Sequence, residues 1–150
     1  LQRHPAMKGI LFDLPHVIEA ARDRIASANL ADRCQLVSGS FFEAVPEGAD
    51  AYMLRHIIHD WDDEKSHSIL QSCHRAMPAN SKLLVVESVI PPGNDPFIGK
   101  LLDLVMLLIP GGKERTENEY RTLFGKAGFE LERVVPTAGE VSIVEARKLS

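Results

Sequence analysis

The segment from His56 to Trp61, which reads HIIHDW, gathers the most reactive side chains of the chain. A histidine titrates near neutral pH, so His59 can take a proton from a bound hydroxyl group as a general base. Asp60 follows it directly, and His56 precedes it by three residues. We interpret His59 as the candidate base and His56 as a structural histidine.

A metal site is the alternative for this segment, because two histidines and an aspartate stand close together. On an extended strand, His56 and His59 would point to opposite faces. On a helix, metal-binding histidine pairs favour the i, i+4 spacing of HExxH, which this segment lacks. No cysteine stands nearby. We therefore expect no metal ligands here.

Two glutamates could orient such a base. Glu87 interrupts the apolar run KLLVVESVI, where a charge is costly unless it is paired or belongs to a site. Glu114 follows two glycines in the sequence GGKERT, and an acid at the N-terminus of a helix is its alternative interpretation. If both acids flank His59, one can hold a ring NH and fix the tautomer.

Asp13 ends the apolar run KGILFD near the start of the chain. A carboxylate at the end of an early strand can accept hydrogen bonds from ribose hydroxyls, although a turn aspartate before Pro15 is the alternative. In dinucleotide-binding folds a glycine-rich loop precedes this acid by roughly 20 residues. No GxGxxG is present, so we expect that loop either to be absent or to lie upstream of residue 1.

The elements that must position these side chains alternate between strand and helix. The apolar patterns predict strands over 8–14, 34–38, 49–58, 82–90, 129–136 and 141–148, and helices over 18–30, 62–77, 97–109 and 116–127. Such alternation predicts an α/β sheet with helices on both faces, closed by an antiparallel C-terminal hairpin. Ligands bind beyond the carboxyl ends of parallel strands, where Asp13, His59 and Glu87 are expected.

Composition narrows the functional class. A chain of 150 residues suits one domain, and its net charge of −4 without a basic block argues against nucleic acid as a partner. The apolar run 101–109 is too short to cross a membrane. Cys34 and Cys73 stand far apart and read as free thiols, which favours the cytoplasm. The sequence contains no GxSxG motif, which argues against a serine hydrolase.

Taken together, these motifs resemble O-methyltransferases of the plant caffeate and hydroxyindole type, in their bacterial form. The similarity covers about residues 8–148. It is carried by FDLPHVIEAA (12–21), SGSFFEAVPEGADAYMLRHIIHDWDDE (38–64), LLVVESVIP (83–91), PGGKERTENEY (110–120) and GKAGFE (125–130). The resemblance implies a Rossmann-like class I methyltransferase sheet. It also implies methyl transfer from S-adenosylmethionine to a hydroxyl of a small, phenolic molecule of secondary metabolism.

The resemblance assigns roles on the acceptor side. His59 resembles the general base, Glu87 and Glu114 resemble the two acids that bracket it, and Asp60 contributes to the site. The family needs no metal. Ile109 stands where plant members often carry Asn, so acceptor recognition is not carried over.

The resemblance also assigns cofactor contacts. Asp13 matches the ribose-binding acid with Leu14 beside it, and Phe41 matches the apolar residue that packs on adenine. Arg55 stands where plant enzymes usually carry Lys, and Ser40 replaces an Asp of the adenine-side motif.

Residues 1–150 are therefore expected to be a partial catalytic domain. The glycine loop with its strand and the N-terminal dimerisation domain would lie outside it, and the full-length protein would be a homodimer. The missing strand would leave two unpaired edges, on the predicted strands 8–14 and 49–58. Two alternatives stay open: a relative with decarboxylase or hydroxylase chemistry, and a non-catalytic fragment that acts as a binding or dimerisation module.

Overall fold

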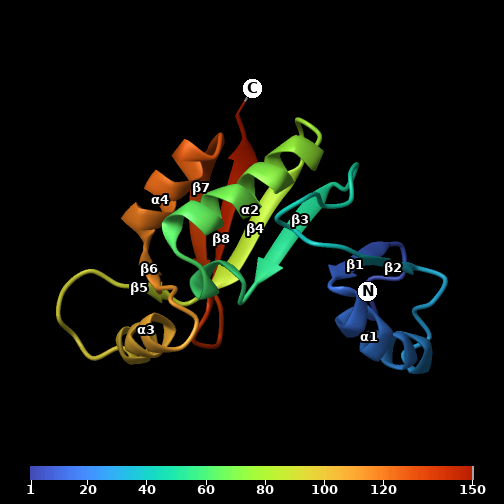
Figure 1. Ribbon diagram of the computed structural model, residues 1–150, viewed down its shortest axis with the longest axis horizontal. Coiled ribbons are helices and arrows are strands. Elements are labelled where there is room, and N and C mark those ends of the chain that lie inside the picture. The colour runs from blue at the N-terminus through green and yellow to red at the C-terminus, as the bar shows by residue number, and fades with distance from the viewer. Residues whose placement is uncertain (150) are drawn as a thin grey trace. The chain divides into compact units, whose positions relative to one another are not determined.

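A computed structural model describes residues 1–149, which form two compact units that divide between Glu47 and Gly48. Figure 1 shows the first unit in blue and the second in colours from cyan to red.

The first unit is a βαβ motif. Strand β1 (Gly9–Asp13), helix α1 (Pro15–Ser27) and strand β2 (Cys34–Ser38) follow one another, and the strands pair in parallel from Gly9↔Cys34 to Asp13↔Ser38. Pro15 occupies the first turn of α1, where its missing N–H costs nothing. The helix packs through the buried Ile18. The carboxyl ends of both strands thus meet at one edge.

The second unit contains a four-stranded mixed sheet of order β3-β4-β8-β7. Strands β3 (Ala51–Arg55) and β4 (Lys82–Glu87) are parallel, whereas β8 (Ser142–Lys148) runs antiparallel to both β4 and β7 (Phe129–Pro136). Helices α2 (Asp63–Ala76) and α4 (Glu117–Lys126) contact each other and cover one face of this sheet (Figure 1). The expected α/β class and the C-terminal antiparallel pair are confirmed.

Local chemistry fixes the helix ends of this unit. The Asp62 side chain caps α2 by accepting a 2.8 Å hydrogen bond from Lys65 N. Thr116 and Glu119 form the predicted capping box at the start of α4. Helix α3 (Ile98–Leu108) leaves much of its apolar surface exposed, with Leu108 at 82%. No helix among residues 1–149 is long and apolar enough to cross a membrane.

Two predicted strands are shorter than expected. The run 82–90 divides at Ser88 into β4 and β5 (Val89–Ile90), because β5 leaves the main sheet and pairs with the short strand β6 (Arg115–Thr116), which the sequence analysis missed. The run 49–58 ends at Arg55, because His56 adopts a left-handed backbone with φ of 52°. The edge of β1 away from β2 and the edge of β3 away from β4 carry no strand partner among the described residues.

Candidate active site

Two carboxylates from separate segments of the second unit lie against the imidazole of His59. His59 lies on η1, a single 3-10 turn (Ile58–Asp60), Glu87 ends β4, and Glu114 directly precedes β6. His59 Nδ1 lies 3.0 Å from Glu114 Oε1 and 3.2 Å from Glu87 Oε2. Both carboxylates are buried, and the His59 side chain is 13% exposed. The structure thus brings together the three residues expected to meet.

This geometry selects a tautomer of His59. With Nδ1 facing a carboxylate oxygen at 3.0 Å, the ring proton belongs on Nδ1 and is donated to Glu114. Nε2 then carries the free lone pair. Asp60 Oδ1 is 3.6 Å from Nε2, too far for a direct hydrogen bond. The ring is therefore oriented by acids on one side and can accept a proton on the other.

The electrostatics favour proton uptake. The hydrogen bond to Glu114 raises the pKa of His59, and the nearby carboxylate of Glu87 raises it further against the opposing effect of burial. Burial raises the pKa of Glu87 itself to about 7. An imidazolium formed at His59 would face the carboxyl groups of Glu114 and Glu87, and this interaction outweighs the cost of burying the charge.

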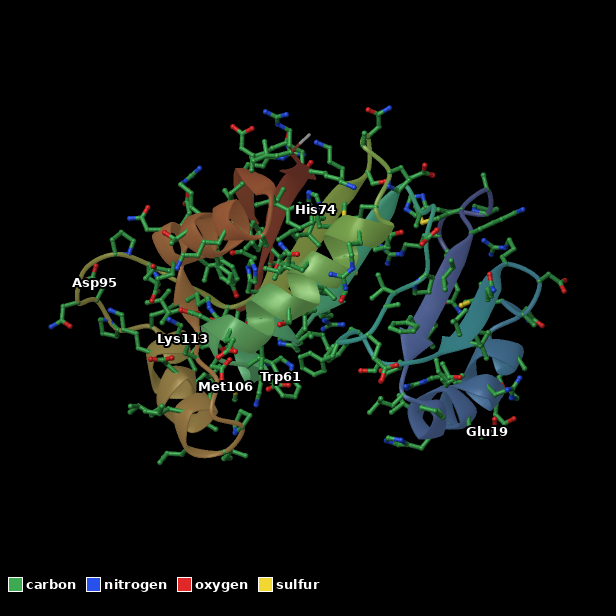
Figure 2. The ribbon with its side chains drawn as sticks, turned by 45° about the horizontal axis from the view of Figure 1, so that its top comes forward. Glu19, Trp61, His74, Asp95, Met106 and Lys113 are labelled. Atoms are coloured by element: carbon green, nitrogen blue, oxygen red, sulfur yellow. The ribbon has the colours of Figure 1, made fainter. Side chains whose placement is uncertain are left out.

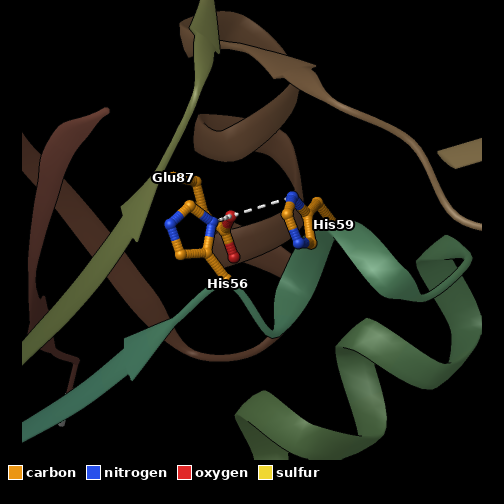
Figure 3. A group of neighbouring side chains, drawn as sticks. All are labelled: His56, His59 and Glu87. Carbon is orange, nitrogen blue, oxygen red and sulfur yellow. Dashed lines mark ion pairs between the residues drawn. The ribbon is translucent and has the colours of Figure 1, made fainter. Parts of the chain in front are cut away.

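The left-handed backbone at His56 shapes the site. It turns the chain so that the N–H groups of Ile57 and Ile58 both donate to Glu87 Oε1, at 2.9 and 3.0 Å. Oε2 of Glu87 is left facing the imidazoles of His56 and His59 (Figure 3). The opposite-face arrangement considered for an extended strand does not occur, because the strand ends at Arg55 and His59 lies in a 3-10 turn; the two ring centroids are 5.3 Å apart.

Arg115 contacts the turn that carries His59, and the sequence analysis assigned it no role. Its fully buried guanidinium donates to the carbonyl oxygens of Ile58 and Trp61, both at 3.0 Å, which flank His59 on the chain. It also binds Asp63 Oδ1, at 2.8 Å, at the start of α2. Arg115 thereby ties the turn that carries His59 to α2. The only signal in the sequence was its place beside Glu114.

Gly112 makes room for the same turn. A Cβ at this position would lie 2.0 Å from the carbonyl oxygen of His59, so only glycine fits. The backbone N–H of Glu114, two residues on, donates to Asp103 Oδ1 of α3 at 2.9 Å. The GGKERT segment is therefore held between η1 and α3.

The residues predicted to bind a cofactor are divided between the units. In the first, Asp13 Oδ1 accepts a 2.7 Å hydrogen bond from Leu14 N at the end of β1. Ser40 and Phe41 follow β2, and the Asp13 carbonyl accepts from Gly39 N at 3.0 Å, so these groups share one edge of the motif. Arg55 is an exposed residue at the end of β3 in the second unit.

Comparison with known proteins identifies the family. The sequence profile of the O-methyltransferase domain matches residues 1–130. Phenazine O-methyltransferase PhzM of Lysobacter antibioticus is 54% identical over 149 residues, which is 99% of this chain. This chain belongs to the O-methyltransferase family.

The solved structures agree with this family assignment. The crystal structure of LaPhzM is matched with a TM-score of 0.96 at 54% identity, over 99% of this chain and 45% of that one. NcsB1 from neocarzinostatin biosynthesis, an O-methyltransferase solved with S-adenosylmethionine and 2-hydroxy-5-methyl naphthoic acid, is matched with a TM-score of 0.89 at 37% identity, over 97% and 43%. The chain spans under half the length of the relatives it matches here, 44% of PhzM and 43% of the NcsB1 chain.

Proposed function

We propose that this protein transfers a methyl group from S-adenosylmethionine to a hydroxyl of a small aromatic molecule, with His59 as the general base. The observation that carries the proposal is the arrangement at His59: Nδ1 is hydrogen-bonded to the buried carboxylate of Glu114 and lies 3.2 Å from that of Glu87, while Nε2 is left to take a proton. Asp60, whose carboxylate lies on the Nε2 side, is proposed to help confine the acceptor there.

The chain's part in the reaction is proton removal and charge stabilisation. A phenolic hydroxyl has a pKa of about 10, so at neutral pH it is protonated and a weak nucleophile. Nε2 of His59 removes that proton, and Glu114 and Glu87 offset the positive charge that develops on the ring. A positioned base contributes roughly 10²–10⁴-fold in rate. The bound cofactor supplies the electrophilic methyl group on its sulfonium.

The first unit fits a nucleoside. Asp13 ends a parallel strand at the edge where such ligands bind, and one carboxylate oxygen is fixed by Leu14 N while the other can accept from a ribose hydroxyl. Phe41 offers an apolar ring after the adjacent strand. Ser40 brings a hydroxyl where the resemblance implies a carboxylate, so we do not count on the adenine-side hydrogen bond that the family makes there. Arg55 is proposed to act near the adenine. NcsB1 was solved with S-adenosylmethionine, which supports this cofactor.

The acceptor class follows from the relatives. PhzM is described as a phenazine O-methyltransferase, and NcsB1 was solved with a hydroxy-naphthoic acid, so both concern fused aromatic rings. We therefore propose a phenolic acceptor. We further propose a homodimer for the full-length protein and a cytoplasmic location, where the free thiols of Cys34 and Cys73 stay reduced.

Substitution of His59 tests the base. We expect His59→Gln to lower turnover by roughly 10²–10⁴-fold, since the proton acceptor is lost. Affinity for S-adenosylhomocysteine, measured by calorimetry, should change little. His16→Gln, an exposed site on α1, is the control. Turnover of His59→Gln within a few-fold of wild type would reject the assignment, and a full-length protein that binds no S-adenosylhomocysteine would reject the cofactor.

A further inference from the structure

One feature of the site exceeds what a general base needs, because a second imidazole lies beside the first. His56 Nδ1 is 3.8 Å from Glu87 Oε2, and His59 Nδ1 is 3.2 Å from the same oxygen. Figure 3 shows the three side chains pointing toward one another. We propose that His56, His59 and Glu87 form a binding site for a divalent transition-metal ion of the zinc class, and that the ion inhibits the enzyme.

The spacing suits zinc. One ligand atom from each of the three residues lies within 4.8 Å of the other two. Tetrahedral zinc sites have bonds of about 2.0–2.2 Å to nitrogen and oxygen, which places neighbouring ligand atoms about 3.3 Å apart. The contacts of 3.2 and 3.8 Å to Glu87 Oε2 are close to that value, so side-chain rotations suffice to close the site.

The donor types point to the same metals. Two imidazole nitrogens and one carboxylate oxygen are typical of zinc sites with three protein ligands and one exchangeable position, whereas magnesium and calcium prefer oxygen alone. Oε2 of Glu87 is buried and accepts no hydrogen bond from any residue in 1–149, so it is an unpaired acceptor beside the two imidazoles. The His56 side chain is 46% exposed, which leaves an approach for an ion.

The backbone at His56 is what creates the ligand set. A non-glycine residue with φ of 52° is uncommon and costs free energy. In an extended strand, His56 and His59 would face opposite ways, and no shared ligand position would exist. The turn that gives Glu87 its two backbone hydrogen bonds therefore also places the second imidazole beside the first.

Metal binding would remove the base, a consequence that rests on the proposed function. An ion at Nδ1 of His59 requires the other neutral tautomer: the proton donated from Nδ1 to Glu114 is released to solvent, and Nε2 takes up a proton in its place. Nε2 then cannot accept the hydroxyl proton. His59 would then bind the ion through Nδ1 and carry a proton on Nε2, so neither nitrogen could act as a base.

The test measures metal binding without any need for turnover. Zn²⁺ is titrated into the chain by calorimetry, and Co²⁺ binding is followed by its visible absorption. We expect one ion per chain. His56→Phe, which removes a ligand, and Glu87→Gln, which removes the charge but keeps an acceptor for Ile57 and Ile58, should each weaken binding at least roughly 10²-fold. His16→Phe, at an exposed histidine, should bind like wild type.

The outcomes separate the metal site from the methyltransferase proposal. Equal affinity in wild type and in both site variants, or no Zn²⁺ binding by wild type at micromolar concentration, overturns the site whether or not methyl transfer occurs. In the methyl-transfer assay, Zn²⁺ should lower the wild-type rate and EDTA should restore it. The ratio of rates with and without Zn²⁺ should stay near one in His56→Phe, and an equal loss in that variant overturns the inhibitory role.

Discussion

At the residue scale, Glu114 controls both the orientation and the proton affinity of His59. Its carboxylate lies 3.0 Å from Nδ1 and is the largest cause of the raised His59 pKa. A base works only when deprotonated, so a raised pKa moves the rising limb of the pH–rate profile upward, above the usual midpoint of about 6.5. The carboxylate also stabilises the imidazolium that forms as the proton is taken.

Glu114→Gln separates these two effects, because glutamine still accepts a hydrogen bond but carries no charge. We expect the rising limb of the methyl-transfer rate to shift to lower pH and the maximal rate to fall roughly 10–100-fold. The profile is measured with EDTA present and compared with Glu140→Gln, an exposed acid on the β7–β8 loop. If the rising limb of the pH–rate profile does not shift in Glu114→Gln, Glu114 does not set the pKa of His59.

At the element scale, features set by residues close together in the sequence were predictable, whereas features that depend on pairing between distant segments were not. The capping box at Thr116 and Glu119 was predictable, because both partners lie within one turn. A charge inside an apolar run singled out Glu87. The break at Ser88 was not predictable, since it depends on β5 pairing with β6, 26 residues further along the chain (Val89↔Arg115). The left-handed turn at His56 equally depends on Glu87 accepting from the two N–H groups that follow.

The hydrogen bonds of Arg115 to the turn that carries His59 are the element-scale feature whose loss has the clearest expected effect on activity. Arg115 binds the two carbonyl oxygens on either side of His59, so its loss should let His59, the proposed base, move. For Arg115→Lys we expect kcat to fall roughly 10²-fold, because a misplacement of about 1 Å costs that much. The KM for the acceptor and the affinity for S-adenosylhomocysteine should change only a few-fold.

Matched controls distinguish positioning from general destabilisation in this variant. Arg121→Lys replaces an exposed arginine of α4 that pairs with Glu117, and its kcat should equal that of wild type. Circular dichroism should show Arg115→Lys folded at the assay temperature, although the unpaired carbonyls cost about 1–3 kcal/mol of unfolding free energy. A folded Arg115→Lys with wild-type kcat would remove Arg115 from the list of positioning residues.

At the scale of the whole molecule, the two units differ greatly in core size. Among the described residues of the first unit, only Ile18 and Cys34 are buried apolar side chains, while most of the core lies in the second. The first unit also relies on a sheet of two strands, which is marginal in isolation. Among the described residues, β1 pairs with β2 alone. Local opening should therefore be far easier in the first unit than in the second.

Hydrogen exchange followed by mass spectrometry measures this difference directly. In the isolated chain we expect amides of β1 and α1 to exchange roughly 10²-fold or more faster than those of β4 and β8, whose side chains include the fully buried Leu83, Val85 and Val144. S-adenosylhomocysteine should slow exchange around Asp13, because a ligand stabilises only the state that binds it. Equal exchange rates in both units without ligand would mean that they open as a single cooperative structure. In that case the small core of the first unit would have to be stabilised by contacts beyond its own.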